Sequence, residues 1–372
     1  MLEGAWTKHD VNLLRVHELN SHATARRLTL TRIRHYFRAT PGKGGSVRPM
    51  FARSVGRMLA AVIVLAAGAC GRDTSTPKTT AHGPVIDSTA PGRTATVNGF
   101  KTPESVRYDS AADVFYVSNI NGSPVAKDDN GFISRMKPDG TIDSLQLIAG
   151  GRNGVTLNAP KGLALVGDTL WVADIDAVRA FNVHSGAVVA TVDLAPFHAV
   201  FLNDVCVGGD GAIYITDSGM KPSGNAMTHV AGADRIFRID AAHHATIALA
   251  SDSLHWPNGI TWDASGKRFI VVPYDNVPQI LAWRPGTPQP VIIGYGSGQY
   301  DGVEILADRR LVITSWADST ISIRDGNVRT AIRELPSPAD IGIDTRRMHV
   351  AVPLLTKDRV EILTIPARKA AQ

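Results

Sequence analysis

The chain has 372 residues, of which 44% are hydrophobic and 6% aromatic, with 34 glycines and 2 cysteines. This length allows one or two domains with a large core, and so few cysteines exclude a disulfide framework as the main source of stability. The formal net charge is +5, but residues 1–58 hold 11 Lys and Arg against 3 Asp and Glu, so the remaining chain carries −3. A mildly acidic folded region argues against a nucleic-acid partner.

Residues 1–49 are basic, rich in Arg and Thr, and show no pattern typical of a fold. They precede a segment with the features of an export signal, and such a signal stands at the start of a protein. We therefore interpret residues 1–49 as a doubtful extension from an over-extended gene model, with Met50 or Met58 as the true start. Residues before Met50 in the native protein would contradict this interpretation.

Residues 50–70 read MFARSVGRMLAAVIVLAAGAC and predict a secretory signal. Arg53 and Arg57 form its basic region, and the apolar region over 59–65 is too short to predict a membrane span. The segment AAGAC that ends at Cys70 resembles a bacterial lipobox. This resemblance implies an exported bacterial lipoprotein, periplasmic or at the cell surface, anchored to a membrane through lipid on Cys70. The alternative is an ordinary cleaved signal in which Cys70 has no role.

Residues 71–93 are rich in Ser, Thr, Pro and Gly. They predict a flexible linker, because this composition cannot bury enough apolar surface to fold. The linker would hold the folded domain, expected over residues 94–367, away from the membrane.

Six segments of this domain share a pattern in which one position, mostly polar, and then a small or acidic residue precede alternating apolar residues. They read TPESVRYD from Thr102, APKGLALV from Ala159, FLNDVCVG from Phe201, WPNGITWD from Trp256, QYDGVEIL from Gln299 and PADIGID from Pro338. Alternation with a period of two predicts strands with one buried face. Further strand-like segments follow each of them, and the repeats are spaced by 57, 42, 55, 43 and 38 residues. The sequence therefore predicts an all-β, six-bladed β-propeller with four-stranded antiparallel blades.

The sixth unit lacks a fourth strand, and we expect the segment TATVNGF from Thr94 to supply it, so that an N-terminal strand closes the last blade. The longer first and third spacings predict insertions, SNINGSPVAKDDNG from Ser118 and TDSGMKPSGNAMTHVAGAD from Thr216. Such loops lie at blade ends and often form a lid or pocket wall. Aromatic residues near strands are more often core than a binding face, which is our expectation for Trp171, Trp256 and Trp316.

One position of the shared pattern holds Glu104, Lys161, Asn203, Asn258, Asp301 and Ala339. The first strand of a propeller blade lines the central channel, so we expect these side chains around one channel mouth. Two carboxylates and two amide oxygens suit a hard cation, with Ca²⁺ favoured and Mg²⁺, Mn²⁺ or Zn²⁺ as alternatives. Lys161 would add a fixed positive charge, available to a substrate anion or to Glu104. Alternatively, the polar residues serve only channel water and turn formation.

The order of these motifs resembles the SMP-30/gluconolactonase/LRE-like family, itself similar to the paraoxonases, over about residues 94–367. In that family a Glu near the domain start, an Asn in an NG motif and an Asp in a DG motif bind the metal. The matching residues are Glu104 in PESV, Asn258 in PNGI and Asp301 in YDGV. Asn203 in LNDV matches a further Asn, a ligand in paraoxonases and a substrate or water contact in gluconolactonases. The resemblance also implies that Asp301 is the general base.

The resemblance implies a metal-dependent hydrolase that opens a sugar lactone or a similar ester. The metal would polarise the carbonyl, and Asp301 would hold or deprotonate the attacking water. Lys161 would bind an acidic part of the substrate, which makes Asp301 and Lys161 the expected catalytic residues. Two alternatives use the same fold: a non-catalytic NHL-like propeller lipoprotein that binds a partner in the cell envelope, and, by a weaker resemblance, strictosidine-synthase-like carbon–carbon bond chemistry. The sequence makes no prediction of the oligomeric state.

Overall fold

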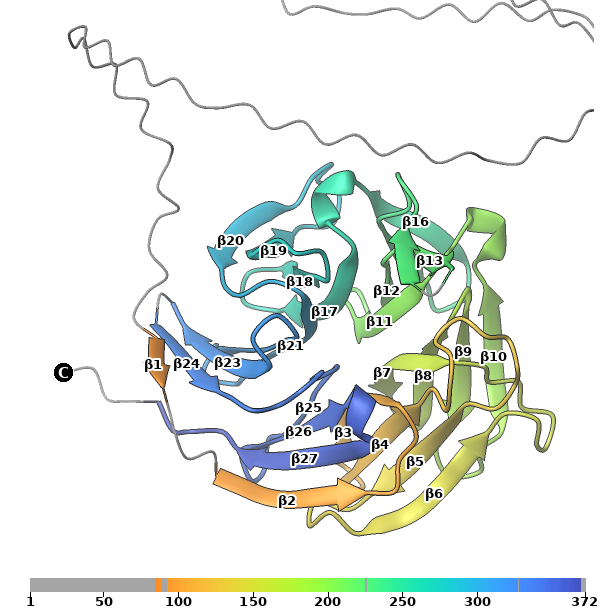
Figure 1. Ribbon diagram of the computed structural model, residues 1–372. Helices are drawn as coiled ribbons and strands as arrows, with labels where there is room; N and C mark the ends of the chain where they lie inside the picture. Colours follow the sequence, from red (N-terminus) through yellow and green to blue (C-terminus); the bar gives the residue numbers. More distant parts are fainter. Residues whose placement is uncertain (1–84, 88–91, 225, 327, 369–372) are drawn as a thin grey trace, which may run out of the picture. The chain divides into compact units, whose positions relative to one another are not determined.

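The structure is a computed structural model that describes residues 85–87, 92–224, 226–326 and 328–368 (Figure 1). The chain divides into two compact units, Met1–Thr74 and Ser75–Gln372, and all described residues belong to the second. The doubtful extension over 1–49, the signal over 50–70 and the lipidation candidate Cys70 therefore lie outside the described residues.

Six antiparallel sheets are arranged around a common axis, which confirms the predicted all-β, six-bladed propeller (Figure 1). From the inside outward, blade 1 is β3 (Pro103–Asp109), β4 (Val114–Asn119), β5 (Phe132–Met136) and β6 (Ile142–Ala149). Blade 2 is β7 (Pro160–Val166), β8 (Thr169–Asp174), β9 (Ala177–Asn182) and β10 (Val188–Asp193). Blade 3 is β11 (Leu202–Val207), β12 (Ile213–Asp217), β15 (Arg235–Ile239) and β16 (Ala245–Ala250).

The second half of the ring repeats this arrangement. Blade 4 is β17 (Pro257–Asp263), β18 (Arg268–Pro273), β19 (Gln279–Trp283) and β20 (Val291–Tyr295). Blade 5 is β21 (Tyr300–Ile305), β22 (Leu311–Ser315), β23 (Thr320–Asp325) and β24 (Val328–Ile332). Blade 6 is β25 (Gly342–Asp344), β26 (His349–Leu354), β27 (Arg359–Thr364) and β2 (Gly92–Asn98).

The ring closes in blade 6, where β2 pairs antiparallel with β27 and Val97 lies opposite Val360. This confirms that an N-terminal strand completes the last blade. β2 begins at Gly92, just ahead of the expected domain start at Thr94. A second strand, β1 (Val85–Asp87), lies within the expected linker and pairs in parallel with β24. The outer edge of β24 offers unpaired backbone groups to which a short extended segment can add.

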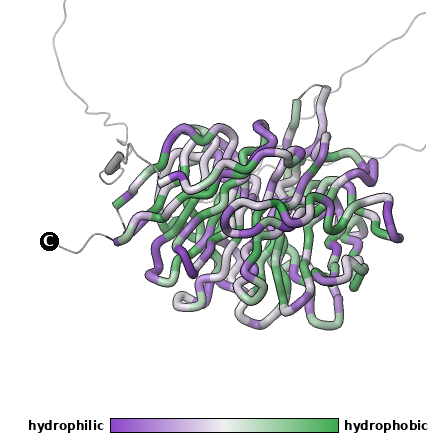
Figure 2. Tube along the Cα trace, turned by 90° about the horizontal axis from the view of Figure 1, so that it is seen from below, coloured by the Kyte–Doolittle hydropathy of each residue, from purple (hydrophilic) through white to green (hydrophobic). Residues whose placement is uncertain are grey.

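Apolar side chains fill the space between neighbouring sheets. Between blades 3 and 4, Phe269 lies 4.4 Å from Tyr214 and 5.6 Å from Trp283, measured between ring centroids. Figure 2 shows hydrophobic stretches within the ring and hydrophilic stretches at many of the turns. Because the apolar side chains pack between the sheets, other side chains of the inner strands can face the central channel.

The first strands of five blades share an irregularity at the polar position of the repeat. The register of β3 against β4 shifts between Pro103 and Val106, and β7, β11, β17 and β21 shift at the equivalent residues. A β-bulge bends a strand and changes the direction of a side chain. The bulge therefore separates the polar side chain from the regular alternation and lets it reach the channel.

In four blades the residue after this polar position is Ser105 or a glycine, and the glycines are needed because the inner strands of adjacent blades approach closely there. A Cβ added to Gly162 would lie 2.4 Å from Cα of Asp204, and one added to Gly259 would lie 2.3 Å from the carbonyl oxygen of Asp301. Atoms cannot approach so closely without a shift of the backbone. The small residues thus bring the polar side chains of neighbouring blades together.

Both predicted insertions lie at the same end of the propeller. The insertion that starts at Ser118 contributes Ile120, Gly122 and Pro124 to a pocket. The insertion that starts at Thr216 contains a hairpin of β13 (Met220–Ser223) and β14 (Ala226–His229). The helices of the described part are three short 3-10 turns, Ala195–Phe197, Asp252–Leu254 and Leu355–Lys357. No helix among the described residues has the length and apolar character needed to cross a membrane.

Candidate active site in the propeller channel

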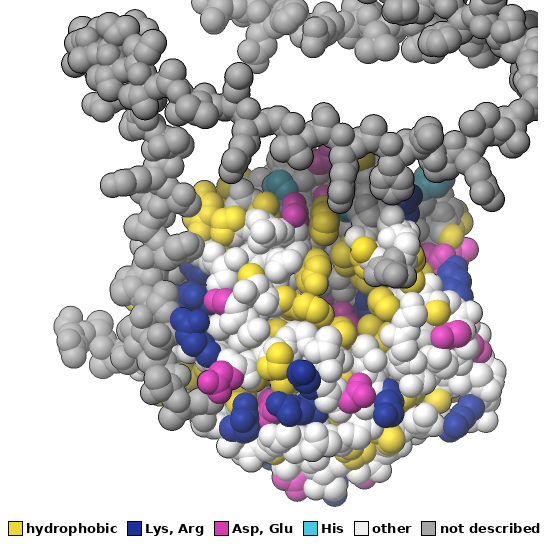
Figure 3. Space-filling view, in the orientation of Figure 1, with side chains coloured by type: hydrophobic (Ala, Val, Ile, Leu, Met, Phe, Trp, Pro, Cys, Tyr) yellow, Lys and Arg dark blue, Asp and Glu magenta, His cyan; other side chains and the backbone are white. Residues whose placement is uncertain are grey.

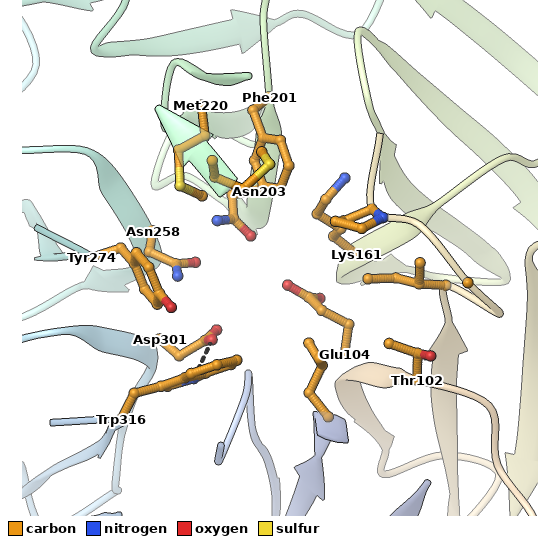
Figure 4. A pocket seen from close by; sticks show the side chains of 15 residues that line it. Thr102, Glu104, Lys161, Phe201, Asn203, Met220, Asn258, Tyr274, Asp301 and Trp316 are labelled. Carbon is orange, nitrogen blue, oxygen red and sulfur yellow. Dashed lines mark hydrogen bonds between the residues drawn. The ribbon is translucent and has the colours of Figure 1, made fainter. Parts of the chain in front are cut away.

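A pocket of about 280 Å³ occupies one end of the channel (Figure 4). Five inner strands each contribute one polar side chain to it: Glu104 from β3, Lys161 from β7, Asn203 from β11, Asn258 from β17 and Asp301 from β21. All five are buried. The structure thus brings together all predicted site residues that it describes. Ala339, at the sixth position, is buried just before β25.

The two asparagines are held with their amide oxygens towards the pocket. Nδ2 of Asn203 donates to Oγ of Ser218 at 3.0 Å, and this Oγ itself donates to the carbonyl of Pro257 at 2.7 Å. Because a hydroxyl has one proton, Ser218 must accept from Asn203, which fixes the amide orientation. Nδ2 of Asn258 donates to the carbonyl of Tyr300 at 3.4 Å, which can only accept. Both Oδ1 atoms therefore remain for a ligand (Figure 4).

Each carboxylate has one buried oxygen that has no hydrogen-bond partner among the described residues, Oε2 of Glu104 and Oδ1 of Asp301. The second oxygen of Asp301, Oδ2, accepts a hydrogen bond from Nε1 of Trp316 at 2.9 Å. Burial raises the pKa of Glu104 well above its usual range, and the Asp301 carboxylate raises it further. Burial and the Asp340 carboxylate likewise raise the pKa of Asp301, against the hydrogen bond from Trp316.

This donor set fits a hard divalent cation. The oxygens of Glu104, Asn203, Asn258 and Asp301 face a common space (Figure 4), and such oxygens are the ligands that Ca²⁺ prefers. A cation there would give both orphaned oxygens a partner and offset the cost of two buried carboxylates. Within the described ranges no group of three or more His, Cys, Asp or Glu is placed to hold a metal, so the amides are essential to this site.

Lys161 lies in the pocket wall beside an aromatic ring. Its Nζ donates to the carbonyl of Ala159 at 3.2 Å and lies 4.3 Å from the ring centroid of Phe201. Burial lowers the pKa of Lys161, and the charge of Glu104 opposes this lowering. An ammonium has three donors, so the bond to Ala159 leaves protons for an anionic or carbonyl group of a substrate.

The wall above the polar residues comes from a position that the repeat alignment does not reveal, the residue directly after the second strand of each blade. We call these residues the upper ring: Ile120, Ile175, Ser218, Tyr274, Trp316 and Leu355. The backbone N–H groups of Ile120, Ser218, Tyr274, Trp316 and Leu355 donate to the residue two places before the polar position of their blade. The upper ring is therefore a second position that recurs in each blade.

The upper ring changes the assignment of one tryptophan. Trp171 is buried in the core, as expected. Trp256 is half-buried outside the core and stacks on His229, with 5.1 Å between the ring centroids. Trp316, however, lines the pocket and holds Asp301. Its constant place directly after the second strand of each blade could have pointed to the pocket wall. An apolar residue at a strand end is, however, equally typical of a core.

Further along the same inner strands, a second set of polar groups is satisfied within the protein. We call it the inner network: Ser105, Arg107, Asp204, Glu304 and Asp340. Oδ2 of Asp340 accepts from Oγ of Ser105 at 2.5 Å, and the two carboxylate oxygens of Asp204 accept from backbone N–H groups at 2.6 and 2.8 Å. Arg107 pairs with Glu304 at 2.5 Å. The bond from Ser105 to Asp340 joins blades 1 and 6, and the bond from the Ile260 N–H to Asp204 joins blades 3 and 4. The Arg107–Glu304 pair joins blades 1 and 5.

The fold and the pocket define a class of protein, a six-bladed β-propeller with an oxygen-lined site in its channel. Residues 102–343 match the model of the SMP-30/Gluconolactonase/LRE-like region. The chain therefore belongs to the SMP-30/gluconolactonase/LRE-like family, which confirms the resemblance seen in its motifs.

Solved structures share the fold at low sequence identity. The gluconolactonase XC5397 from Xanthomonas campestris is 17% identical with a TM-score of 0.54, over 77% of this chain and 99% of that chain. A regucalcin from Agrobacterium tumefaciens, described as a calcium-binding protein, is 14% identical with a TM-score of 0.52, over 76% and 95%. A streptogramin B lyase is 12% identical with a TM-score of 0.50, over 73% and 96%. No curated protein matches the chain.

Proposed function

We propose that the protein is a metal-dependent hydrolase of the lactonase type, which opens a lactone or a similar ester in the channel pocket. The observation that carries this proposal is the convergence of four side-chain oxygens, two of them buried without a partner in the described part of the chain. Family membership supports the reaction class. Ca²⁺ is the cation we favour, because all four donors are oxygens, with Mg²⁺, Mn²⁺ and Zn²⁺ as alternatives.

A divalent cation held by Glu104, Asn203, Asn258 and Asp301 would supply Lewis-acid polarisation of the ester carbonyl. The Asp301 carboxylate, which Trp316 holds through Oδ2, would accept a proton from the water that adds to the carbonyl carbon. When the ring C–O bond breaks, this proton passes to the leaving alkoxide and the product is a hydroxy acid. The ammonium of Lys161 would bind a carbonyl or carboxylate oxygen of the substrate.

We also propose that the protein is exported and held at a membrane through a lipid on Cys70. The support is the sequence of residues 50–70 and the linker-like composition that follows. Labelling of growing cells with a fatty-acid analogue should mark the wild type and not Cys70→Ser. Equal labelling of both would contradict the anchor and leave the channel site unaffected.

The first test of the channel site combines metal content with thermal unfolding of the full chain. A cation that binds only the folded state, at 100 times its Kd, adds about 2.7 kcal/mol of stability. We expect Ca²⁺ to raise the unfolding temperature of the wild type and of Asp252→Asn, an exposed carboxylate outside the pocket. Glu104→Gln and Asp301→Asn should abolish the rise.

A panel of lactones and esters then tests catalysis. Hydrolysis that needs the cation and is lost in Asp301→Asn would support the enzyme. If the protein binds no metal and none of the four cations shifts its unfolding temperature, the site is contradicted. A partner-binding propeller would then be the better proposal.

A further inference from the structure

The pocket has two levels of different chemistry. The polar side chains that would hold the cation and the reacting ester form its floor, and the upper ring forms the wall above them. Five of the six upper-ring residues are apolar or aromatic, and Ser218, the exception, is already bonded to Asn203. Ile120, Tyr274, Trp316 and Leu355 line the pocket directly.

The two insertions extend the apolar wall. Pro124 comes from the insertion that starts at Ser118. Met220 and Met227 come from the β13–β14 hairpin in the other insertion. Figure 3 shows hydrophobic side chains gathered around the hollow of this face, with an acidic side chain visible inside it. Met227 is 40% exposed, so water contacts a large apolar side chain at the pocket wall when no ligand is bound. Methionine adapts its shape to varied apolar ligands.

The wall offers few partners for hydroxyl groups. Of the described residues that line the pocket above the floor, Thr102, Tyr274 and Trp316 have hydrogen-bonding side chains, and the N–H of Trp316 already donates to Asp301. A polyhydroxylated ring that enters such a pocket gives up hydrogen bonds to water that the wall does not replace. An alkyl or aryl group has no hydrogen bonds to water to give up, and the burial of its apolar surface favours binding.

We propose that the natural substrate is a lactone or ester with an alkyl or aryl substituent, and not a polyhydroxylated sugar lactone, with Met220, Met227 and Trp316 as specificity-determining residues. This inference rests on the proposed function for its reaction. The reacting ester would lie on the polar floor, and the substituent would lie between the upper ring and the hairpin. Specificity then comes from the wall, separately from the chemistry at the floor.

The test uses the full chain with Ca²⁺ and a series of γ-alkyl butyrolactones of increasing chain length, with glucono-δ-lactone for comparison. We expect kcat/KM to rise by about 3- to 4-fold for each added methylene until the pocket is filled. The longer lactones should exceed glucono-δ-lactone by at least about 10-fold. Met227→Gln should reduce the gain per methylene, whereas Ile247→Gln, an exposed apolar residue on the outer strand β16, should not.

A binding measurement separates the two proposals. The matching γ-alkyl lactams, which resist hydrolysis, and gluconolactam are titrated calorimetrically into the same variants. Lactam affinity that rises with chain length supports apolar recognition, even if no lactone is hydrolysed and the proposed reaction is therefore wrong. Hydrolysis of glucono-δ-lactone in preference to every alkyl lactone would overturn the inference and leave the proposed function intact. Gluconolactam that binds as tightly as the longest alkyl lactam would also overturn it.

Discussion

The inner strands of the propeller carry two polar regions that differ in one respect. At the pocket end, Glu104 and Asp301 each have a buried oxygen that lacks a partner within the described structure. In the inner network, Asp204 and Asp340 each accept a hydrogen bond from a neighbouring blade, and Asp204 accepts a second from the backbone of Val205. Both regions bury carboxylates, but Asp204 and Asp340 have hydrogen-bond partners inside the protein, although burial still raises the pKa of both. The unpartnered oxygens of Glu104 and Asp301, which lie together in a pocket, therefore point to a ligand, whereas the bonded carboxylates of Asp204 and Asp340 point to a structural role.

Asp301→Asn tests this difference most directly, because it keeps the shape of the side chain and removes its charge. We expect kcat/KM to fall by about 10³-fold, the size of a lost general base, and the Ca²⁺-dependent thermal shift to vanish. Without Ca²⁺ the variant should be at least as stable as the wild type, because a buried charge with one orphaned oxygen is gone. A large loss of stability without metal would place Asp301 among the structural groups.

The complementary change is Asp204→Ala in the inner network. It leaves two buried backbone N–H groups without an acceptor. Since each such group costs about 1–3 kcal/mol and the loss of a buried charge offsets part of this, we expect unfolding to become easier by roughly 2 to 4 kcal/mol. Denaturant unfolding measures the change. Near-normal stability together with lost Ca²⁺ binding would contradict the structural role.

A smaller effect is expected from Trp316→Phe, which keeps an aromatic ring in the upper ring but removes the hydrogen bond to Asp301. A hydrogen bond to a charged group contributes about 1.5–3 kcal/mol, so we expect kcat to fall by roughly 10- to 100-fold. The bond lowers the pKa of Asp301, and its loss should move the acidic limb of the pH–rate profile to higher pH. Trp171→Phe, in the core away from the pocket, is the control and should leave that limb in place.

Much of the fold could be predicted because it repeats. Alternating inner strands recur along the chain, and the unit without a fourth strand required one from elsewhere, which β2 supplies. The pairing of β1 with β24 could not be predicted in this way. It depends on a free sheet edge in the assembled ring, and nothing in three residues of sequence encodes that edge.

The site likewise has features that follow from the repeat and features that depend on contacts in the folded protein. The side chains of Glu104, Asn203 and Asp301 occupy one repeated position, so the sequence could place them around one axis. The direction of the Asn203 amide could not be predicted, because it depends on a serine after β12 whose own proton is used by Pro257. Trp316 was missed for a different reason, since its sequence context does not distinguish a pocket wall from a core.

The smallest predicted effect concerns Asp340, whose pKa burial raises to about 6 from the usual 3.8. The folded state therefore holds this proton more tightly than the unfolded chain does. The resulting stabilisation is complete below the unfolded pKa and is lost as the pH rises through the folded pKa. The unfolding free energy of the wild type relative to Asp340→Asn should thus fall by about 1 kcal/mol between about pH 5 and pH 7. Removal of this charge also relieves Glu104 and Asp301, which acts in the same direction.

Asp263→Asn is the matched control for this measurement. Partial burial raises the pKa of Asp263, but hydrogen bonds from Ser265, Gly266 and Arg268 outweigh it and lower the pKa below the usual value. The stabilisation from Asp263 is therefore present above its unfolded pKa and is lost only as the pH falls through the lower folded value. Between about pH 5 and pH 7 its difference from the wild type should be flat. A flat difference for Asp340→Asn as well would mean that Asp340 stays ionised, and that its bond to Ser105 offsets the full cost of a buried charge.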